Sequence, residues 1–162
     1  MRGFNMVEAG LWHSKSFRAL EHSNERLLYL YLKTSPHQNS SGCCRLPAGY
    51  ACDDLQWTHA DYAAALEALV KGGLVLHDTD SDEIFVMDWF GVNVPQNPKH
   101  KQGTDKFIAK IQSDRLRQAA SEACQFAYDE IVRRAAENVG LRRGPEQRSM
   151  LLPVGGSKGR AA

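Results

Sequence analysis

The sequence lacks the long apolar run of a membrane-spanning helix and the dense cysteines of a disulfide scaffold. Its longest apolar run, from Leu27 to Leu32, is far shorter than the ~20 residues that cross a bilayer. The first residues, Met1 to Leu11, contain no signal-peptide core. Four cysteines among 162 residues are too few for a disulfide framework, so we expect free thiols in a reducing compartment. These absences predict a cytoplasmic protein.

Recognisable catalytic and zinc-binding motifs are also missing. The six histidines are dispersed, and neither the H-E-x-x-H helix of zinc proteases nor the G-x-S-x-G turn of serine hydrolases occurs. Cys43, Cys44 and Cys52 with His59 could supply zinc ligands, but they lack C-x-x-C or H-x-x-x-H spacing. We therefore predict no enzyme activity, no metal and no cofactor.

One acidic loop resembles the opening of a calcium site. Asp78, Asp80 and Asp82 alternate as the first ligands of a calcium loop do. The sixth position of the loop is Glu83, where the sharp turn needs glycine, and the twelfth is Trp89, where a bidentate Glu is needed. The loop is therefore predicted to be a solvated acidic turn or an acidic surface for a partner.

The chain has a length that suits one domain and an uneven distribution of charge. Of its 162 residues, 43% are hydrophobic and 24% charged, which is typical of a soluble domain with some chain left over. The net charge is +1, but residues 1–92 hold 7 Lys and Arg against 12 Asp and Glu, a balance of −5. Residues 93–162 hold 13 against 7, a balance of +6. The second half is therefore the candidate for binding a polyanion.

Apolar periodicity and capping residues predict helices, short strands and a β-hairpin. Ser23 is expected to cap the first helix, and Thr58 with Asp61 forms a capping-box pattern before a later one. The predicted helices cover residues 24–35, 48–55, 59–71, 104–112 and 114–139. The predicted strands cover residues 43–46, 74–77 and 84–87, of which the last two form the hairpin.

This order of elements is typical of a winged helix-turn-helix, in which the helix over residues 59–71 reads DNA and the hairpin is the wing. We therefore predict a mainly α fold with a small β-hairpin and a C-terminal helical extension. The predicted parts are an N-terminal arm (1–10), the winged helix-turn-helix domain (11–96), a basic helical extension (97–139) and a mobile tail (140–162).

An ordered set of short segments carries a resemblance to a known family. The segments are Leu11-Trp12 with Phe17 and Leu20, Leu28 to Pro36, Asn39 with Gly42 and Leu46-Pro47, Ala65-Leu66 with Leu69, Gly73 to Val75, Ile84 to Trp89, and Asn97 to Lys99. Over residues 11–99 the chain resembles the winged-helix domains of phage and bacterial replication-initiation proteins, the DnaD-like primosomal and replisome-organiser group. The resemblance implies a DNA-binding module at a replication origin or an operator, commonly attached to a region that oligomerises or contacts replication proteins.

The candidate DNA-binding residues lie around the helix 59–71 and in the basic segment after the hairpin. The helix offers Thr58, His59 and Lys71, but its outward alanines and Glu67 leave few groups to read bases. Residues 97–117 hold 6 Lys and Arg against 2 Asp, a net of +4 that suits phosphate contacts, although a solvated helix face is the alternative explanation. The candidate phosphate contacts here are Lys99, His100, Lys101, Lys106, Lys110, Arg115 and Arg117.

Two further surfaces are candidates for protein contacts. The hairpin tip carries Asp78, Asp80, Asp82 and Glu83, which phosphates would repel, so we expect it to bind a protein partner or to be solvated. The helix 114–139 has an apolar stripe wider than one contact line, so we expect it to form a homodimer; the alternative is that it folds back onto its own domain. The predicted interface residues are Leu116, Ala120, Ala123, Phe126, Ala127 and Ile131.

The sequence thus predicts double-stranded DNA binding within a phage-type replication-initiation or regulatory complex. The alternative is a protein-interaction module that uses the winged helix to bind a replication or host factor without DNA. The two hypotheses differ in one observable, because affinity for a random duplex falls steeply with salt under the first and is absent under the second.

Overall fold

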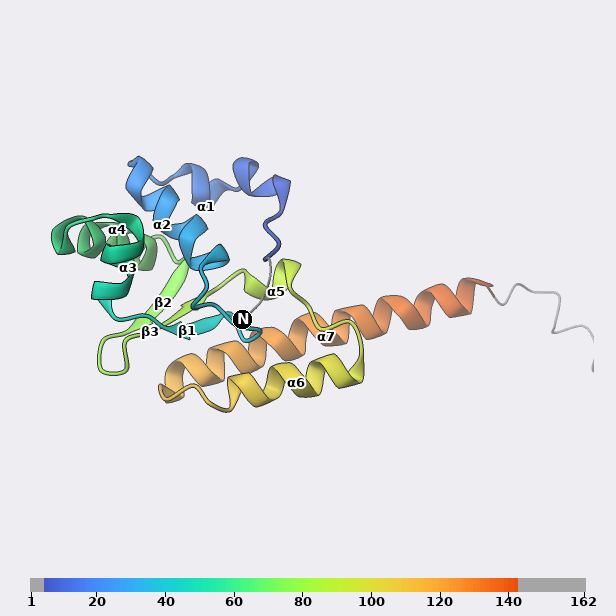
Figure 1. Cartoon of the computed structure of the whole chain (residues 1–162). Helices are drawn as coiled ribbons and strands as arrows, with labels where there is room; N and C mark the ends of the chain where they lie inside the picture. The colour runs from blue at the N-terminus through green and yellow to red at the C-terminus, as the bar shows by residue number, and fades with distance from the viewer. Residues whose placement is uncertain (1–4, 143–162) are drawn as a thin grey trace, which may run out of the picture. The chain divides into compact units, whose positions relative to one another are not determined.

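The computed structural model describes residues 5–142 of the chain, with side chains described up to residue 138. The fold is mainly helical with a small three-stranded antiparallel sheet (Figure 1). The chain forms two compact units, of which the first extends to Asp129 and the second begins at Glu130. The boundary expected at residue 97 therefore falls inside the first unit.

The N-terminal helices begin with a turn of 3-10 helix, η1. The bounds are Ala9–His13 for η1, Lys15–Arg18 for α1 and Ser23–Thr34 for α2. Ser23 was expected to cap α2, but the helix starts one residue earlier, with His22 as its N-cap. The Glu25 carboxylate accepts the backbone N–H groups of His22 and Glu21 at 3.2 and 2.8 Å, which satisfies two donors at the start of the helix.

Helices α3 (Ala48–Leu55) and α4 (His59–Lys71) follow a short strand, and both confirm the predicted bounds. The Thr58 hydroxyl oxygen accepts the backbone N–H of Asp61 at 3.2 Å, as the capping pattern predicts. The turn between the two helices is closed by Gln56, which adopts a left-handed conformation with φ of 55°.

The sheet has the strand order β1-β3-β2, with all neighbours antiparallel. Its strands are β1 (Cys43–Arg45), β2 (Val75–Asp78) and β3 (Glu83–Val86). Every residue of the central strand β3 is buried. Since neighbouring side chains of a strand point to opposite faces, both faces of this sheet are covered.

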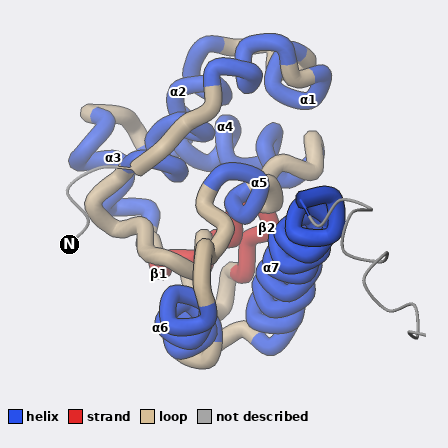
Figure 2. Tube along the Cα trace, turned by 90° about the vertical axis from the view of Figure 1, so that its right-hand side faces the viewer, coloured by secondary structure: helices blue, strands red, loops and turns tan. Residues whose placement is uncertain are grey.

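Two helical layers provide this cover within the first unit. Helices α1 to α4 lie on one side of the sheet, and α6 with the beginning of α7 lies on the other (Figure 2). These later helices are α5 (Trp89–Val92), α6 (Pro98–Ile108) and α7 (Asp114–Arg142). Ile108, Leu116 and Ala120 from the second layer belong to the same hydrophobic core as the strands.

Three predicted boundaries differ from the structure in this region, and one of them is the end of α6, which lies at Ile108 instead of residue 112. Helix α6 begins at Pro98 instead of residue 104, because the Asn97 side chain accepts the backbone N–H of His100 at 2.8 Å and Pro98 suits the first helical turn. Helix α7 begins at Asp114 as predicted but continues to Arg142, beyond residue 139. The rest of the predicted mobile tail, residues 143–162, lies outside the described residues.

The second unit begins within α7, at Glu130. Arg133 forms ion pairs with Glu130 at 2.9 Å and with Glu137 at 2.5 Å along the helix. Glu130 also lies 3.7 Å from Arg134, as its i,i+4 spacing predicts. Val132 in this unit is 51% exposed.

An ion pair between a buried lysine and a half-buried aspartate joins α2 to the segment that follows β3. The Lys33 ammonium is fully buried and lies 2.6 Å from a carboxylate oxygen of Asp88. It also lies 5.1 Å from the ring centroid of Tyr29, which adds a cation–π contact. This pair fixes the start of α5, where Trp89 enters the core.

Trp89 packs directly against the glycine that precedes β1. Gly42 has a φ of +71°, a conformation that side chains disfavour, and an added Cβ would lie only 2.6 Å from the Trp89 Cβ. The Trp89 indole N–H donates to the Ser40 carbonyl oxygen at 3.1 Å, so the ring cannot move away without losing this bond. The close approach therefore needs glycine at position 42.

We expect Gly42→Ala to lower the free energy of unfolding by about 2–4 kcal/mol, from left-handed strain together with overpacking against Trp89. Gly49→Ala is the matched control, because Gly49 lies in α3 with nothing within 4 Å of an added Cβ. Alanine there should leave stability unchanged or raise it by up to about 1 kcal/mol. Urea denaturation measures both, and equal effects would contradict this account of Gly42.

Candidate nucleic-acid interface

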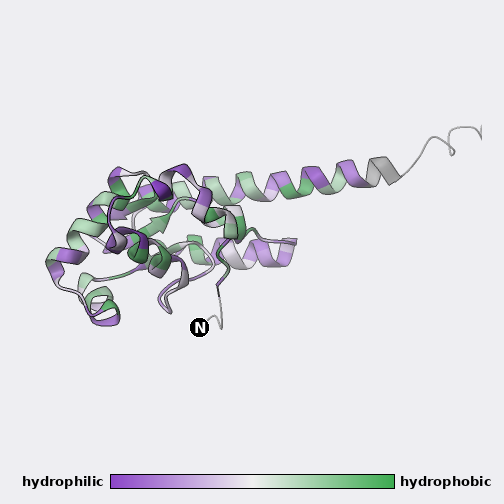
Figure 3. Cartoon of the chain, turned by 90° about the horizontal axis from the view of Figure 1, so that it is seen from above, coloured by the Kyte–Doolittle hydropathy of each residue, from purple (hydrophilic) through white to green (hydrophobic). Residues whose placement is uncertain are grey.

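Helix α6 and the turn after it present a row of lysines on one exposed face. Lys99 and Lys106 are exposed and lie about 20° apart around the axis of α6 at 3.6 residues per turn, and exposed Lys110 lies in the turn two residues after the helix. We call these three residues the lysine face. Thr104 and Ile108, on the opposite side of α6, are buried against the core. Figure 3 shows α6 as a mainly hydrophilic helix, whereas the strands are mainly hydrophobic.

The acids of this segment are paired with bases outside the lysine face. Lys101 Nζ lies 2.6 Å from Asp105 Oδ1, and its side chain is only 15% exposed. Arg117 forms an ion pair with Asp114 and also donates to the carbonyl oxygen of Ile111 at 2.7 Å. Lys101 and Arg117, both predicted phosphate contacts, are thus engaged within the protein. Among the described residues, no carboxylate forms an ion pair with the lysine face.

The other basic residues of the segment differ in their surroundings. Arg115 is exposed, but its guanidinium donates to the His77 carbonyl oxygen at 2.6 Å. His100 is half-buried, and its Nδ1 accepts the backbone N–H of Gln96 at 3.3 Å. Lys110 lies over the Phe107 ring at 5.6 Å, which leaves its ammonium at the surface. The basic residues of the segment therefore fall into two groups: the exposed lysine face, and the bases whose side chains bond to other groups of the protein.

Helix stability does not explain the bases at the start of α6. The first turn of a helix has a partial positive charge, which disfavours cations there by about 0.3–1 kcal/mol each. The first turn of α6 has no acidic residue, yet Lys99, His100 and Lys101 all lie in it. The added positive field of the helix end instead strengthens the attraction for an anion.

The outward face of α4 is apolar. Thr58, His59 and Lys71 are exposed, as the predicted DNA contacts require, but Thr58 is committed to capping and its hydroxyl donates to Asp61 at 2.6 Å. Between the ends of the helix, Val70 is 42% exposed. It lines a groove of about 510 Å³, bounded by Ala48, His59, Tyr62, Ala63, Leu66, Glu67, Val70 and His77. The alanine-rich face of α4 is evident from the sequence, but the groove is not. One wall of the groove comes from His77 of β2, which is distant in the sequence.

The acidic hairpin tip is partly an internal contact, which corrects the prediction of a uniformly solvated or partner-binding tip. Glu83 is only 6% exposed, and its carboxylate accepts the backbone N–H groups of Gln112 at 2.9 Å and Ser113 at 2.8 Å. The Ser113 hydroxyl donates to Asp78 at 2.6 Å, and this bond holds the pKa of Asp78 below its usual value. Two of the four acids therefore attach the turn between α6 and α7 to the sheet.

The remaining acids of the tip lie at the surface. Asp80 is exposed and half-buried Asp82 lies 3.6 Å from the guanidinium of Arg45. Asp82 also has a left-handed φ of 54°, which fits a tight hairpin turn. Only Asp80 and Asp82 therefore keep the predicted role of an acidic surface at the tip.

The predicted dimer stripe on α7 divides into buried and exposed parts. Leu116 and Ala120 are fully buried and so are not available to a partner, and half-buried Ala123 and Ala127 pack partly against the same core. This corrects the prediction, because the first turns of α7 fold back onto the sheet. Phe126 is 73% exposed and lies away from the buried side of the helix.

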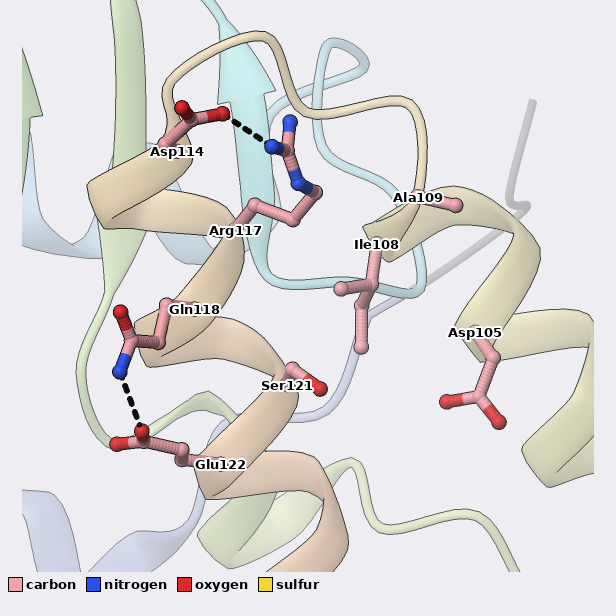
Figure 4. Close-up of a pocket in the computed structure, with 8 residues that line it drawn as sticks. All are labelled: Asp105, Ile108, Ala109, Asp114, Arg117, Gln118, Ser121 and Glu122. Carbon is pink, nitrogen blue, oxygen red and sulfur yellow. Dashed lines mark hydrogen bonds and ion pairs between the residues drawn. The ribbon is translucent and has the colours of Figure 1, made fainter.

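A crevice with polar and apolar lining lies between α6 and the first turns of α7 (Figure 4). Its volume is about 680 Å³. It is lined by Asp105, Ile108, Ala109, Asp114, Arg117, Gln118, Ser121 and Glu122. Gln118 donates to Glu122 at 2.9 Å, so the polar groups of the crevice are engaged largely with one another.

The cysteines are poorly placed for nucleophilic or metal chemistry. All four are free and buried. Burial raises the pKa of Cys44 to about 12 and that of Cys124 to about 11, which disfavours the thiolate. Within residues 5–142, no three His, Cys, Asp or Glu side chains gather as metal ligands would.

Comparison with family models, with curated proteins and with solved structures finds no match to this chain. In the part of the chain that the structure describes, no helix is both long and apolar enough to span a bilayer.

Replacing Glu83 by Ala should lower the free energy of unfolding by about 1–3 kcal/mol, because the half-buried backbone N–H of Gln112 and the buried backbone N–H of Ser113 lose their acceptor. Hydrogen exchange should accelerate at Gln112 and Ser113. Asp80→Ala is the control and should change stability by less than about 0.5 kcal/mol, since Asp80 is exposed. Equal denaturation midpoints for the two variants would contradict the docking role of Glu83.

Proposed function

We propose that the chain is a winged-helix protein that binds double-stranded DNA within a phage-type replication-initiation or regulatory complex. The element order α2, β1, α3, α4, β2, β3 and the strand order β1-β3-β2 support the winged-helix interpretation. The resemblance over residues 11–99 is the reason for grouping the chain with replication-initiation proteins. In this interpretation α4 is the reader helix and the β2–β3 hairpin is the wing.

The observation that carries DNA binding is the lysine face. Lys99 and Lys106 on one side of α6 and Lys110 in the turn after it are exposed and have no carboxylate partner among the described residues. The phosphates of a DNA backbone can supply the negative charges that this row of ammonium groups lacks. Binding also releases the counterions condensed on the DNA, which favours the contact. Exposed Arg115, close to the hairpin, can add a further phosphate contact.

The surface of α4 gives this binding little base specificity. Direct readout needs side chains that donate or accept two hydrogen bonds at a base edge. The middle of α4 presents Ala63, Glu67 and Val70, none of which makes the common bidentate contacts with guanine or adenine. We therefore infer that phosphate contacts supply most of the affinity and that different duplex sequences bind similarly.

The apolar groove favours a second candidate function. A module that recognises another protein through α4, without DNA, would use the groove as its binding surface. This alternative predicts that a random duplex does not bind even at low salt. Binding of protein and DNA on separate surfaces is compatible with the first proposal.

Reversing charge on the lysine face should abolish most duplex binding. Lys106→Glu with Lys110→Glu should weaken affinity for a random duplex by about thirtyfold or more, because each lost phosphate contact removes ~0.9 from the salt slope. Fluorescence anisotropy with a labelled duplex measures the affinity.

The matched control reverses two exposed bases on α1, Lys15→Glu with Arg18→Glu, and so changes the net charge by the same amount. Because α1 lies in the other helical layer, this variant should lose far less affinity than the variant of the lysine face (Figure 1). Equal losses in the two variants would contradict a defined lysine face and indicate a response to net charge alone.

We also propose that the chain forms a homodimer through the part of α7 that follows Asp129. Ile131, Val132 and Ala135 lie on one side of this segment, and Val132 and Ala135 are exposed. Phe126 lies about 120° around the helix from Val132, at 3.6 residues per turn, so one contact line cannot include both. The interface is therefore narrower than the sequence predicted.

Light scattering of the full chain tests this interface. We expect a dimer mass at tens of micromolar, and a monomer mass for Val132→Asp, because a buried unpaired carboxylate costs several kcal/mol. Phe126→Asp places the same charge on another side of α7 and should leave the dimer intact. A monomer mass for the unmodified chain would refute the proposal.

A further inference from the structure

The groove on α4 is a continuous apolar surface that the proposed DNA contacts do not use. Six of its residues, at positions 59, 62, 63, 66, 67 and 70, follow one side of α4 at spacings of three and four. Ala48 from α3 and His77 from β2 complete the walls. Burial lowers the pKa of His77, so a neutral imidazole faces this surface.

The groove has one carboxylate in its lining, that of Glu67. Asp82 of the hairpin is close enough to interact electrostatically with both Tyr62 and His77, and the Arg115 guanidinium donates to the His77 carbonyl oxygen at 2.6 Å. Arg45 neutralises part of the Asp82 charge at 3.6 Å. The complementary occupant therefore has apolar side chains with a basic residue beside them.

A segment of this chain outside the described residues has that chemistry. Residues 148–154 read Arg-Ser-Met-Leu-Leu-Pro-Val, an apolar run that directly follows a base. Between residues 143 and 162 the sequence has four Lys or Arg and only one acid, Glu146. The segment thus complements the groove in both hydrophobicity and charge.

The length of the groove also matches the extended length of the apolar run. The groove runs along α4 from His59 to Val70, which is about 16 Å at 1.5 Å per residue. An extended stretch of the five residues from Met150 to Val154 spans about 17 Å at ~3.3 Å per residue. Pro153 is compatible with an extended segment and unfavourable inside a helix. Pro153 has no backbone N–H to donate. Because side chains line the groove, a segment bound there does not need to donate a hydrogen bond from position 153.

We propose that the α4 groove binds residues 148–154 of this chain, with the apolar run along Tyr62, Leu66 and Val70 and Arg148 beside Glu67. This contact goes beyond DNA binding and is independent of the lysine face. It covers the apolar face of the reader helix with a segment of the same protein.

Disulfide trapping in the full chain tests the contact. Because the four natural cysteines are buried, a Val70→Cys, Leu151→Cys variant should form one new disulfide under mild oxidation, identified by peptide mass mapping. A cross-linked monomer identifies binding within one copy and a cross-linked dimer binding between copies; either result supports the proposal. Gln102→Cys with Leu151→Cys is the control, since Gln102 is exposed on α6. Trapping no faster than in this control would overturn the proposal.

A binding measurement gives a second, independent test. A labelled peptide of residues 146–156 should bind the full chain carrying Leu151→Asp and Leu152→Asp, whose own segment no longer competes. Adding Val70→Asp should weaken that binding by about tenfold or more, because the carboxylate would be buried against apolar side chains. Leu27→Asp, an exposed apolar position on α2 outside the groove, should leave it unchanged.

The remaining outcomes separate this contact from DNA binding. Peptide affinity should be the same with and without Lys106→Glu and Lys110→Glu, since the lysine face lies outside the groove. Equal peptide affinity in the Val70→Asp and Leu27→Asp backgrounds, or no peptide binding at all, would overturn the assignment of the groove to residues 148–154.

Discussion

The structure depends on one buried carboxylate, that of Glu83 in the middle strand of the sheet. Its two oxygens accept the backbone N–H groups of Gln112 and Ser113, at the point where α7 begins. A charged acceptor at a helix N-terminus is favoured by the helix dipole as well as by the hydrogen bonds. Asp78 reinforces the contact through the Ser113 hydroxyl. Because this attachment places α6 and α7 on the second face of the sheet, it also decides which side of α6 meets water.

Most carboxylates near the basic segment have a hydrogen-bond or ion-pair partner within the protein, whereas the lysine face has no carboxylate partner among the described residues. In the hairpin, Glu83 and Asp78 dock the start of α7 and Asp82 pairs with Arg45, whereas in the basic segment Asp105 and Asp114 pair with Lys101 and Arg117. The bases of the lysine face have no such partner among the described residues. A sequence with a net charge of only +1 can therefore present a concentrated positive surface, because the two acids of the basic segment, Asp105 and Asp114, are paired with bases outside the lysine face.

Local signals in the sequence predicted local structure well. The capping pattern at Thr58 and the apolar spacing that follows it predicted α4 to the residue, and the two apolar runs predicted the hairpin. What the sequence could not predict came from contacts between distant segments. Glu83 was assigned to a surface loop because nothing near it signals that residues 112 and 113 need an acceptor. Leu116 and Ala120 were assigned to a dimer because a stripe that packs on its own sheet has the same spacing as one that packs on a second copy. The groove likewise needs β2 beside α4, which no spacing within α4 reveals.

The central claim is that a few defined ammonium groups on α6 contact phosphates, and the salt dependence of duplex binding tests it most directly. The logarithm of the association constant should fall linearly with the logarithm of salt concentration, with a slope of about −3 to −4 for three or four phosphate contacts at ~0.9 each. Several random duplexes should give the same slope and similar affinities, since the surface of α4 offers little for reading bases. The absence of duplex binding at low salt, or an affinity that does not change with salt, would contradict the account.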